Sequence, residues 1–309
     1  PVLDPAGPFA GPIEVVAWVL FVMAAVVMTV VLIALGIALF GPRRWKRRVS
    51  GERLVWIGGL AFPIVVLTGL LIYGLTTTAR VAEAPRPGEM RVRVTGEMWW
   101  WRVAYLDDQG REILQDANEV HIPAGQPVVF ELESADVIHS FWVPRLGGKT
   151  DMIPGRRNFM RLQADQPGTY GGQCAEYCGG PHALMGLVVV AHTPQDFAAW
   201  RARQAGPALI PAAQGDALVA RGRDVFAASG CGACHTIRGT EANGLAGPDL
   251  THVGSRQTIG AGVLPNNQGT LAGWISDSQG IKPGNRMPSY PVLTGQDLRA
   301  VSAYLDSLK

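Results

Sequence analysis

The chain has 309 residues, enough for more than one domain, and its formal net charge is only +2. That balance gives no bulk attraction to nucleic acid, which is not expected as a partner. Charged residues make up 17% of the chain and its mean hydropathy is +0.14. A soluble enzyme of this length is usually more polar, so a membrane part is expected.

Two uncharged apolar runs occupy residues 15–40 and 54–75. Each is long enough to cross a bilayer as a helix, and each is longer than the apolar core of a secretory signal. We therefore predict a transmembrane hairpin within residues 1–78, with helices at about 14–40 and 54–76. Two buried helices of a soluble protein are the alternative. Because the chain starts without a methionine, removal of an upstream segment is expected.

The loop between the two runs is strongly basic. By the positive-inside rule it lies in the cytoplasm, so everything after the hairpin lies on the outer face of the membrane. A nucleic-acid patch is the alternative for such a run, but its position between two apolar spans disfavours it. The basic residues are Arg43, Arg44, Lys46, Arg47, Arg48 and Arg53.

From residue 90 the chain alternates polar and apolar residues and is rich in valine and aromatics, which predicts strands. A polar linker with prolines precedes this part at residues 79–89. We expect a small all-β sandwich or barrel, and place this domain at residues 79–200. The strand-like runs are 90–105, 128–134 and 187–193, and turns rich in Gly or Pro fall at 123–127 and 166–172.

Residues 201–214 have the Ala, Pro and Gly content of a linker, and the character becomes helical from residue 217. The last predicted helix has one apolar face, because its leucines and valine recur at spacings of three and four. An all-α module is therefore expected at residues 215–309. The apolar residues of that helix are Leu298, Val301, Leu305 and Leu308.

The four cysteines of the chain fall in two close pairs beside histidines, which indicates metal or cofactor ligands. The second pair lies in CGACH, the C-x-x-C-H pattern of c-type haem attachment. Cys231 and Cys234 would bond to the haem vinyl groups and hold His235 against the iron. Met287, in NRMPSY, is placed as the second axial ligand, which raises the potential of the iron. A thioredoxin-like pair and a core methionine are the alternatives.

This module resembles class I c-type cytochromes. Gly222 and Phe226 before the cysteine pair, Pro248 after it and the terminal helix carry the resemblance. It implies that the loop of Pro248 packs beside the haem and fixes the partner of His235.

The segment CAEYCGGPHALM offers two thiols, an imidazole and a thioether. This donor set favours copper in an electron-transfer role over zinc. Since a mononuclear blue-copper site needs one cysteine, a second one makes sense if Cys174 and Cys178 bridge two metals. Each metal would be completed by its own histidine, His182 in this segment and His139 in DVIHSFWVP. A disulfide on the oxidising outer face is the alternative.

These segments resemble cytochrome c oxidase subunit II. QCAEYCGGPHALM is similar to its CuA loop, DVIHSFWVP to its upstream histidine segment and GEMWWWRV to its aromatic segment. LGGKTDMIPGR is similar to the loop that faces the catalytic subunit. The resemblance covers residues 12–195 and implies a two-helix hairpin followed by a cupredoxin-like domain. With the appended cytochrome, the chain resembles subunit II of a caa-type oxidase.

That resemblance implies roles for individual residues. His139 and His182 would each bind one copper, and Cys174 and Cys178 would bridge both. Met185 would be the weak ligand of one copper.

The same resemblance gives Glu176 two roles: its backbone carbonyl would be the weak ligand of the other copper, and its carboxylate would face a magnesium ion at the interface with subunit I. Trp99 falls where electrons enter. Glu97 and Trp100 depart from the residues common at those positions in the family. Whether Glu52 or Glu14 serves a proton path is left open.

The function implied is that of the electron-input subunit of a proton-translocating haem–copper oxidase in the bacterial inner membrane. Its CuA and cytochrome domains would lie on the periplasmic face, with subunits I and III and membrane lipid as partners. Cytochrome c or a bc-type complex would reduce the haem c, and electrons would pass through CuA to subunit I, where oxygen is reduced to water.

Two other functions stay open: a membrane-bound electron carrier without an oxidase partner, and a CuA-bearing subunit of a nitrogen-oxide reductase. The Glu176 carboxylate and the KTDMIPGR segment favour the oxidase, because both make sense against a subunit I.

Overall fold

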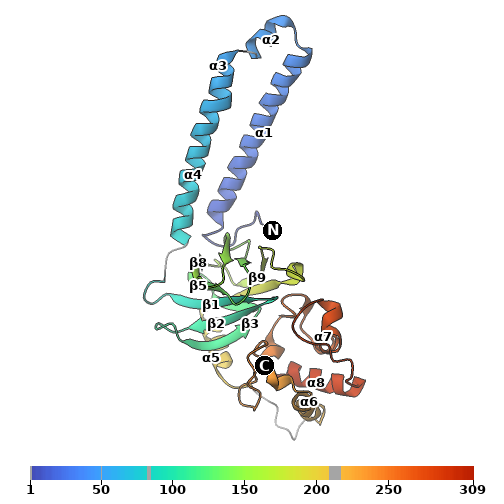
Figure 1. Cartoon of the computed structure of the whole chain (residues 1–309). Coiled ribbons are helices and arrows are strands. Elements are labelled where there is room, and N and C mark those ends of the chain that lie inside the picture. The colour runs from blue at the N-terminus through green and yellow to red at the C-terminus, as the bar shows by residue number, and fades with distance from the viewer. Residues whose placement is uncertain (1, 50, 82–84, 209–216) are drawn as a thin grey trace.

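The computed structural model describes residues 2–49, 51–81, 85–208 and 217–309. A helical hairpin, a β module and a C-terminal helical module follow one another along the chain (Figure 1). Of the expected linker at 201–214, residues 209–214 lie outside the described residues, as do the first two residues of the expected C-terminal module.

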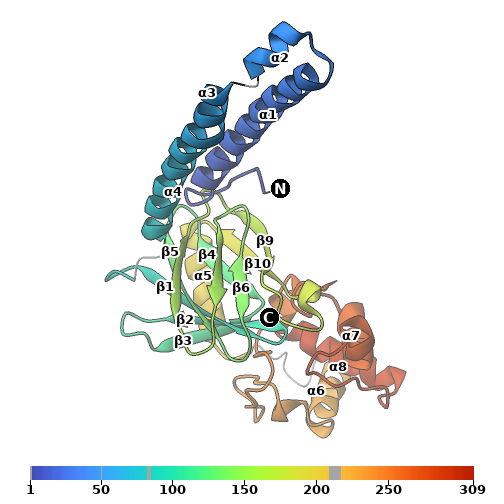
Figure 2. The same ribbon diagram turned by 45° about the horizontal axis from the view of Figure 1, so that its top comes forward.

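The hairpin projects from the β module as two long helices that run side by side (Figures 1 and 2). The first is α1 (Gly11–Phe40), with a mean hydropathy of 2.9, and the second span, Glu52–Ala79, has 2.3. None of either apolar window is buried in the protein. The two predicted apolar helices are confirmed, and bare apolar surface of this length is typical of a membrane anchor. The basic loop holds a short helix, α2 (Arg43–Val49), that the sequence analysis did not predict.

The second span changes its winding near its start. It comprises α3 (Glu52–Leu54), the π-helical segment η1 (Val55–Ala61) and α4 (Phe62–Val81). Pro63 has no N–H to donate to the carbonyl of Gly59, so regular α-helical bonding is interrupted there. A widened π turn just before the proline fits that interruption.

The strands of the β module are β1 (Met90–Glu97), β2 (Trp100–Leu106), β3 (Glu112–Ala117), β4 (Glu119–Pro123), β5 (Val128–Ser134), β6 (His139–Trp142), β7 (Lys149–Met152), β8 (Asn158–Leu162), β9 (Gly168–Cys174) and β10 (Gly186–His192). Within residues 85–208 they form two five-stranded sheets, in the orders β3-β2-β1-β5-β8 and β4-β10-β9-β6-β7. The β1–β5 and β10–β4 pairs are parallel. The predicted all-β sandwich is confirmed.

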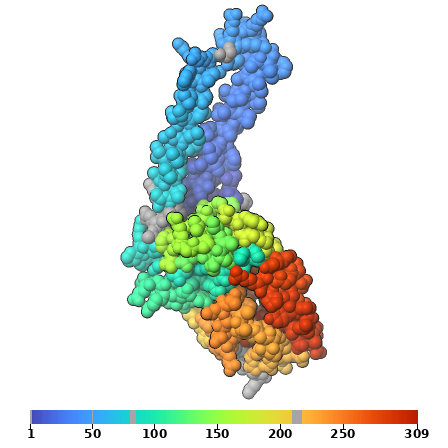
Figure 3. Space-filling view, in the orientation of Figure 1, coloured from blue at the N-terminus to red at the C-terminus, as the bar shows by residue number. Residues whose placement is uncertain are grey.

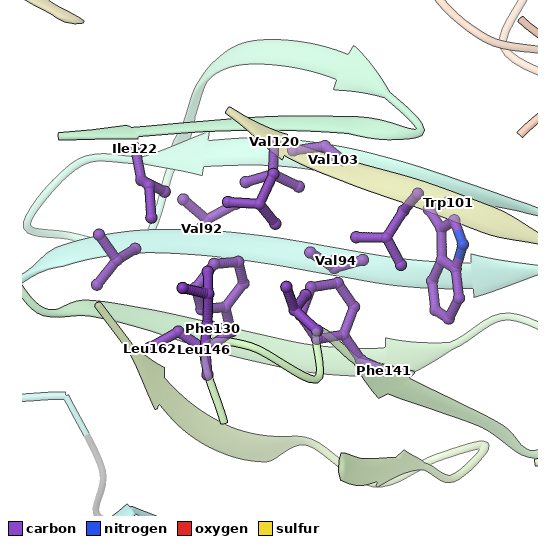
Figure 4. Close-up of a cluster of buried hydrophobic side chains, with 14 of the residues drawn as sticks. Val92, Val94, Trp101, Val103, Val120, Ile122, Phe130, Phe141, Leu146 and Leu162 are labelled. Atoms are coloured by element: carbon purple, nitrogen blue, oxygen red, sulfur yellow. The ribbon is translucent and has the colours of Figure 1, made fainter. Parts of the chain in front are cut away.

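The core of the sandwich lies between the two sheets (Figure 4). Val92 and Val94 alternate along β1 and point inward, as the two-residue period of a strand requires. Trp101 meets Phe141 edge to face, with ring centroids 5.7 Å apart. Phe141 pairs with Cys174 across β6 and β9. The rigid core therefore supports the strand ends that carry His139 and Cys174.

The predicted turn at 166–172 is wrong over most of its length, because β9 begins at Gly168. Gly172 in this strand lets Trp142 and Leu187 of the neighbouring strands approach its backbone closely. A Cβ on Gly172 would lie 2.7 Å from the carbonyl oxygen of Trp142 and 2.9 Å from Cγ of Leu187. Gly172, one of the glycines that suggested a turn, is therefore part of the packing between neighbouring strands.

The β module ends in a helix, α5 (Pro194–Ala205), which extends into the range expected to be a linker. Thr193 caps it by accepting a hydrogen bond from the backbone N–H of Asp196 at 3.2 Å. Phe197 and Trp200 are buried in the sandwich core.

The C-terminal module is helical, as predicted. Its elements are α6 (Ala217–Ala228), η3 (Cys231–Ala233), η4 (Val253–Ser255), β11 (Thr258–Ile259), β12 (Leu264–Pro265), α7 (Gln268–Ile281) and α8 (Gly295–Ser307). The first and last helices pack closely. A Cβ on Gly222 would lie 2.0 Å from the carbonyl oxygen of Ala300, and Phe226 meets Tyr304 edge to face at 5.9 Å.

Gly222→Ala is expected to destabilise the C-terminal module by about 1–3 kcal/mol or more, because the added methyl group forces α6 and α8 apart. The free energy of unfolding of this module, followed by haem absorbance during denaturant titration of the full chain, measures the effect. Gly273→Ala is the matched control, since a Cβ at Gly273 would meet no neighbouring atom within 4 Å. That change should stabilise α7 by up to ~1 kcal/mol. Equal stabilities for the two variants would contradict this packing.

Candidate metal and haem centres

The segment between β9 and β10, residues 174–185, is called the copper loop below. Cys174 is the last residue of β9, and Met185 immediately precedes β10. His182 begins a short 3-10 turn within the loop. His139 begins β6, the strand beside β9. The ends of neighbouring strands therefore bring a distant histidine to the loop.

Each cysteine of the copper loop faces its own histidine. Cys174 Sγ lies 3.8 Å from His139 Nδ1, and Cys178 Sγ lies 3.4 Å from His182 Nδ1. The two sulfurs are 3.8 Å apart, far beyond the ~2.05 Å of a disulfide bond. Met185 Sδ lies 3.8 Å from Cys178 Sγ. Two thiols, two imidazoles and a thioether thus converge on one point.

A backbone carbonyl oxygen, that of Glu176, also lies next to these donors. The Cys174 thiol donates to the carbonyl oxygen of Glu176 at 3.2 Å. Ligand atoms of His139, Cys174 and Cys178 all lie within 4.8 Å of one another, and all three residues are buried. The soft sulfur and imidazole donors suit copper.

The two thiols cannot both ionise unaided. Burial raises the pKa of Cys174, but hydrogen bonds with His139 and the backbone N–H of Ser140 outweigh it and bring this pKa to about 7. Burial and the charge of Cys174 raise the pKa of Cys178 to about 12. Two adjacent buried thiolates need cations between them, which is what a bridged metal pair supplies. The residues present therefore fit a dinuclear copper centre.

Asp136 orients His139. Its carboxylate accepts a hydrogen bond from His139 Nε2 at 2.8 Å, which leaves Nδ1 free to face Cys174. A second oxygen of Asp136 accepts from the backbone N–H of Met98 at 2.8 Å. Burial alone would raise the pKa of Asp136, but the bonds from His139 and Met98 lower it. An ionised carboxylate behind a ligating histidine fixes the ring and its tautomer.

Asp136→Ala is expected to weaken copper binding by about 10- to 100-fold, because the His139 ring loses the partner that orients it. Copper affinity is measured by competition with a chelator on the purified full chain. Asp108→Ala removes an exposed carboxylate from the β2–β3 turn and serves as the control. Equal copper affinities for the two variants would show that Asp136 does not support the site.

Trp99 lies over the copper loop. Its Nε1 donates to the carbonyl oxygen of Cys178 at 2.9 Å. A Cβ added to Gly179 or Gly180 would lie 3.4 Å or 3.3 Å from its ring, so the absence of side chains lets the indole approach. The structure therefore places the tryptophan expected to receive electrons directly against a cysteine of the site.

The side of the copper loop that faces the hairpin is open. A cavity of about 530 Å³ there is lined by Cys174 and His182 of the loop, Lys149 of β7 and Ile13 of α1. The Glu176 carboxylate is partly exposed and lies 4.0 Å from Lys149 Nζ. The arrangement leaves this carboxylate available to a partner on the membrane side.

The haem-binding segment holds its histidine by a backbone bond. His235 Nδ1 donates to the carbonyl oxygen of Pro248 at 2.8 Å, which leaves Nε2 free for the iron. A Cβ on Gly247 would lie 2.6 Å from the ring, so the loop packs tightly against it. Burial lowers the pKa of His235 and keeps it in the neutral form that binds metals. Cys231 and Cys234 are free thiols just before it, as haem attachment requires.

Met287 is held from several directions. Its N–H donates to Asn285 Oδ1 and its carbonyl oxygen accepts from Ser278 Oγ, both at 2.8 Å. Trp274 Nε1 donates to its sulfur at 3.1 Å. Met287 belongs with the apolar side chains that pack on the core of the C-terminal module. The two thiols, the imidazole and the thioether of this module are the donors that would hold a c-type haem.

The two carboxylates considered for a proton path lie on the hairpin, apart from these centres. Glu14 accepts a hydrogen bond from Trp18 Nε1, and Glu52 accepts one from Trp56 Nε1, each at 3.3 Å. Both contacts join residues one helical turn apart.

Sequence reasoning missed the residues that support the ligands. Asp136 stands three residues before His139, a spacing that could have indicated a partner for it. Lys282 and Arg286 stand near Met287 and contact the β module. No local pattern identifies such contacts, because they join residues far apart in the chain.

Two protein-family profiles match the chain. The family described as "Cytochrome C oxidase subunit II, periplasmic domain" matches residues 105–192, and the family described as "Cytochrome c" matches residues 219–309. The two matches fall on the β module and the C-terminal module, and each contains its own predicted centre.

Curated relatives match over most of the chain. A "Cytochrome c oxidase subunit 2" of Alkalihalophilus pseudofirmus is 37% identical over 99% of this chain and 90% of its own length. Another, from Bacillus sp. strain PS3, is 32% identical over 85% of this chain and 76% of its own. Among solved structures, the periplasmic domain of subunit II of cytochrome oxidase of Bradyrhizobium japonicum is 29% identical, with a TM-score of 0.36, covering 40% of this chain and 96% of that one.

Proposed function

Because this chain belongs to the cytochrome c oxidase subunit 2 family and carries a C-terminal cytochrome c domain, we propose that it is the electron-input subunit of a haem–copper terminal oxidase. Electrons enter at the cytochrome module from cytochrome c or a bc-type complex. They cross to the copper-binding β module and leave for subunit I, where oxygen is reduced to water. Subunits I and III are the proposed partners in a proton-translocating enzyme.

The observation that carries this proposal is the packing of the cytochrome module on the β module beside the copper loop. The backbone N–H of Gly186, next to Met185, donates to the carbonyl oxygen of Ala261 at 2.9 Å. Lys282 donates to the carbonyl oxygen of Trp99 at 2.6 Å. Two electron-transfer centres held together in one chain favour internal transfer over diffusion to separate acceptors.

The ligands proposed for the copper pair are His139, Cys174, Cys178 and His182, with Met185 as a weak ligand, and the carbonyl of Glu176 completes the set. When bound, the copper pair and haem c supply one-electron transfer, which none of these side chains performs alone. The protein holds the donors on rigid strand ends and fixes the His139 tautomer through Asp136.

In the cytochrome module, Cys231 and Cys234 would attach the haem, and His235 and Met287 would bind its iron. Pro248 holds His235 by its carbonyl. Two protein ligands on the iron would favour electron transfer over oxygen chemistry, which is the role assigned to this module.

The proposed exit toward subunit I is the membrane-facing cavity beside the copper loop. Cys174 and His182 line it, and α1 contributes Ile13. We assign to the Glu176 carboxylate a magnesium ion shared with subunit I, since exposed carboxylate oxygens are the ligands that this ion prefers. The β7 region, with Lys149, would form part of the same interface.

The proposed orientation follows from the basic loop. α2 carries Arg43, Arg44 and Lys46, which the positive-inside rule places in the cytoplasm. The copper-binding and cytochrome modules then lie at the other end of the hairpin, on the periplasmic face of a bacterial inner membrane (Figure 1).

Oxygen uptake by the purified complex tests this function. The complex should contain a haem–copper partner subunit and consume oxygen when supplied with reduced cytochrome c. Turnover of nitric oxide in place of oxygen would assign the chain to a nitrogen-oxide reductase. Purification without any haem–copper partner would instead indicate a membrane-bound carrier, and either result overturns the proposal.

A further inference from the structure

The cytochrome and β modules meet along a surface that has two polar regions. In the first, Arg256 pairs with Asp116 at 2.8 Å, and the N–H of Gln257 donates to Glu119 at 2.9 Å. The second lies beside the copper loop, at Trp99 and Asp136. In Figure 3, the red surface of the last part of the chain lies against the yellow surface of the β module.

Lys282 is the buried polar contact of the second region. Its Nζ donates to the carbonyl oxygens of Trp99 at 2.6 Å and Gly260 at 3.0 Å, and only 2% of the residue is exposed. Burial lowers its pKa to about 7. Lysines are rarely buried without partners, and these partners come from both modules. Trp99 in turn donates through its ring to the carbonyl oxygen of Cys178.

Arg286 is the charged contact of the same region. Its guanidinium lies 3.1 Å from one carboxylate oxygen of Asp136. The other oxygen of Asp136 accepts the hydrogen bond from His139 Nε2 at 2.8 Å. Arg286 immediately precedes Met287 in the chain. A single ion pair therefore connects the residue beside a haem ligand with the carboxylate behind a copper ligand.

The segment that carries both contacts is a fixed turn. Asn285 Nδ2 donates to the carbonyl oxygens of Lys282 and Ser278, each at 2.8 Å. Its Oδ1 accepts from the N–H of Met287 at 2.8 Å. A shift of Lys282 or Arg286 would therefore be transmitted to Met287 through one short, hydrogen-bonded stretch of chain.

We propose that Lys282 and Arg286 are positioning residues that hold the Met287 edge of the cytochrome module against the copper loop, and that electrons cross between the modules at this contact. The inference rests on the proposed function. The transfer oxidises the cytochrome module by one electron and reduces the copper-binding module by one, with no change of bonds or protons.

The two residues should have separable effects. The positive charge of Arg286 favours the reduced form of a nearby centre, so Arg286→Gln should lower the midpoint potential of the copper centre. Lys282→Met removes the two hydrogen bonds from Nζ to the carbonyl oxygens of Trp99 and Gly260. Losing them should shift the docking equilibrium of the two modules by about tenfold or more. It should slow transfer between the modules by a similar factor.

The test uses the purified oxidase complex of full-length chains. Redox titration with EPR gives the potential of the copper centre, and rapid mixing with a reductant gives the transfer rate. Arg286→Lys is the conservative variant. Arg221→Gln is the matched control, because Arg221 is a half-exposed arginine that pairs with Asp297 inside the cytochrome module, at 2.8 Å. Arg256→Gln removes the ion pair of the first region and shows the effect of weaker docking between the modules without a change at Trp99 or Asp136.

The proposal predicts a lowered copper potential in Arg286→Gln, its restoration in Arg286→Lys and slower transfer in Lys282→Met. It predicts no change in Arg221→Gln and an unchanged copper potential in Arg256→Gln. If Arg286→Gln and Lys282→Met match Arg221→Gln in potential and rate, the proposal is overturned while the proposed function stands. If the unmodified complex shows no transfer between the modules, the proposed function fails and the inference fails with it.

Discussion

Cys174→Ser is expected to abolish the two-copper, mixed-valence EPR signal of the complex and to leave the haem c spectrum intact. The hydroxyl is a poor bridge for copper, and Cys174 is the sulfur that faces both His139 and the Glu176 carbonyl. Loss of a supporting contact costs about 10- to 100-fold at a metal site, and loss of a bridging ligand should cost more. Oxygen consumption should therefore fall by more than about 100-fold.

The matched control for this prediction is Ser140→Ala, which removes another small polar side chain from the same buried region. Copper content and EPR are measured on both purified variants. Cys174→Ser should contain less copper, and Ser140→Ala should retain the native signal. A full copper content with an unchanged mixed-valence spectrum in Cys174→Ser would show that Cys174 does not bridge the two coppers.

Met287→Leu is expected to change the axial ligation of haem c and to lower its midpoint potential. A methionine ligand raises the potential of a histidine-bound iron, and leucine offers no donor. The fall should be on the order of 0.1 V, within the ~0.8 V range that axial ligands set. Electrons would then leave the donor less readily, and turnover with reduced cytochrome c should slow.

Met160→Leu is the control, since Met160 is a buried methionine in the sandwich core with 1% of its surface exposed. Spectroelectrochemical titration gives the haem potential of each variant. Met160→Leu should match the unmodified chain. An unchanged potential in Met287→Leu would show that Met287 is a packing residue and that another group binds the iron.

The proposed ligands could be predicted because most of them lie close together in short sequence segments. Cys174, Cys178, His182 and Met185 lie within one loop, and the loop itself brings their donor atoms together. His139 was harder, because it reaches the site only through the β6–β9 pairing. Its local context next to an apolar, aromatic strand was enough to select it.

The supporting residues could not be predicted because they depend on how the modules pack. Lys282 and Trp99 are 183 residues apart, and Arg286 and Asp136 are 150 apart. No periodicity or motif in one segment indicates such a partner. The misassigned turn at 166–172 has a related cause: Gly172 is required by the side chain of Leu187 on another strand.

The time course of haem c and copper after rapid reduction of the purified complex by one equivalent of reductant, in the presence of oxygen, tests the proposed electron path most directly. We expect haem c to be reduced first, the copper centre to gain an electron as haem c is reoxidised, and oxygen then to be consumed. Reduction of the copper centre before haem c, or haem c that is not reoxidised, would rule this path out.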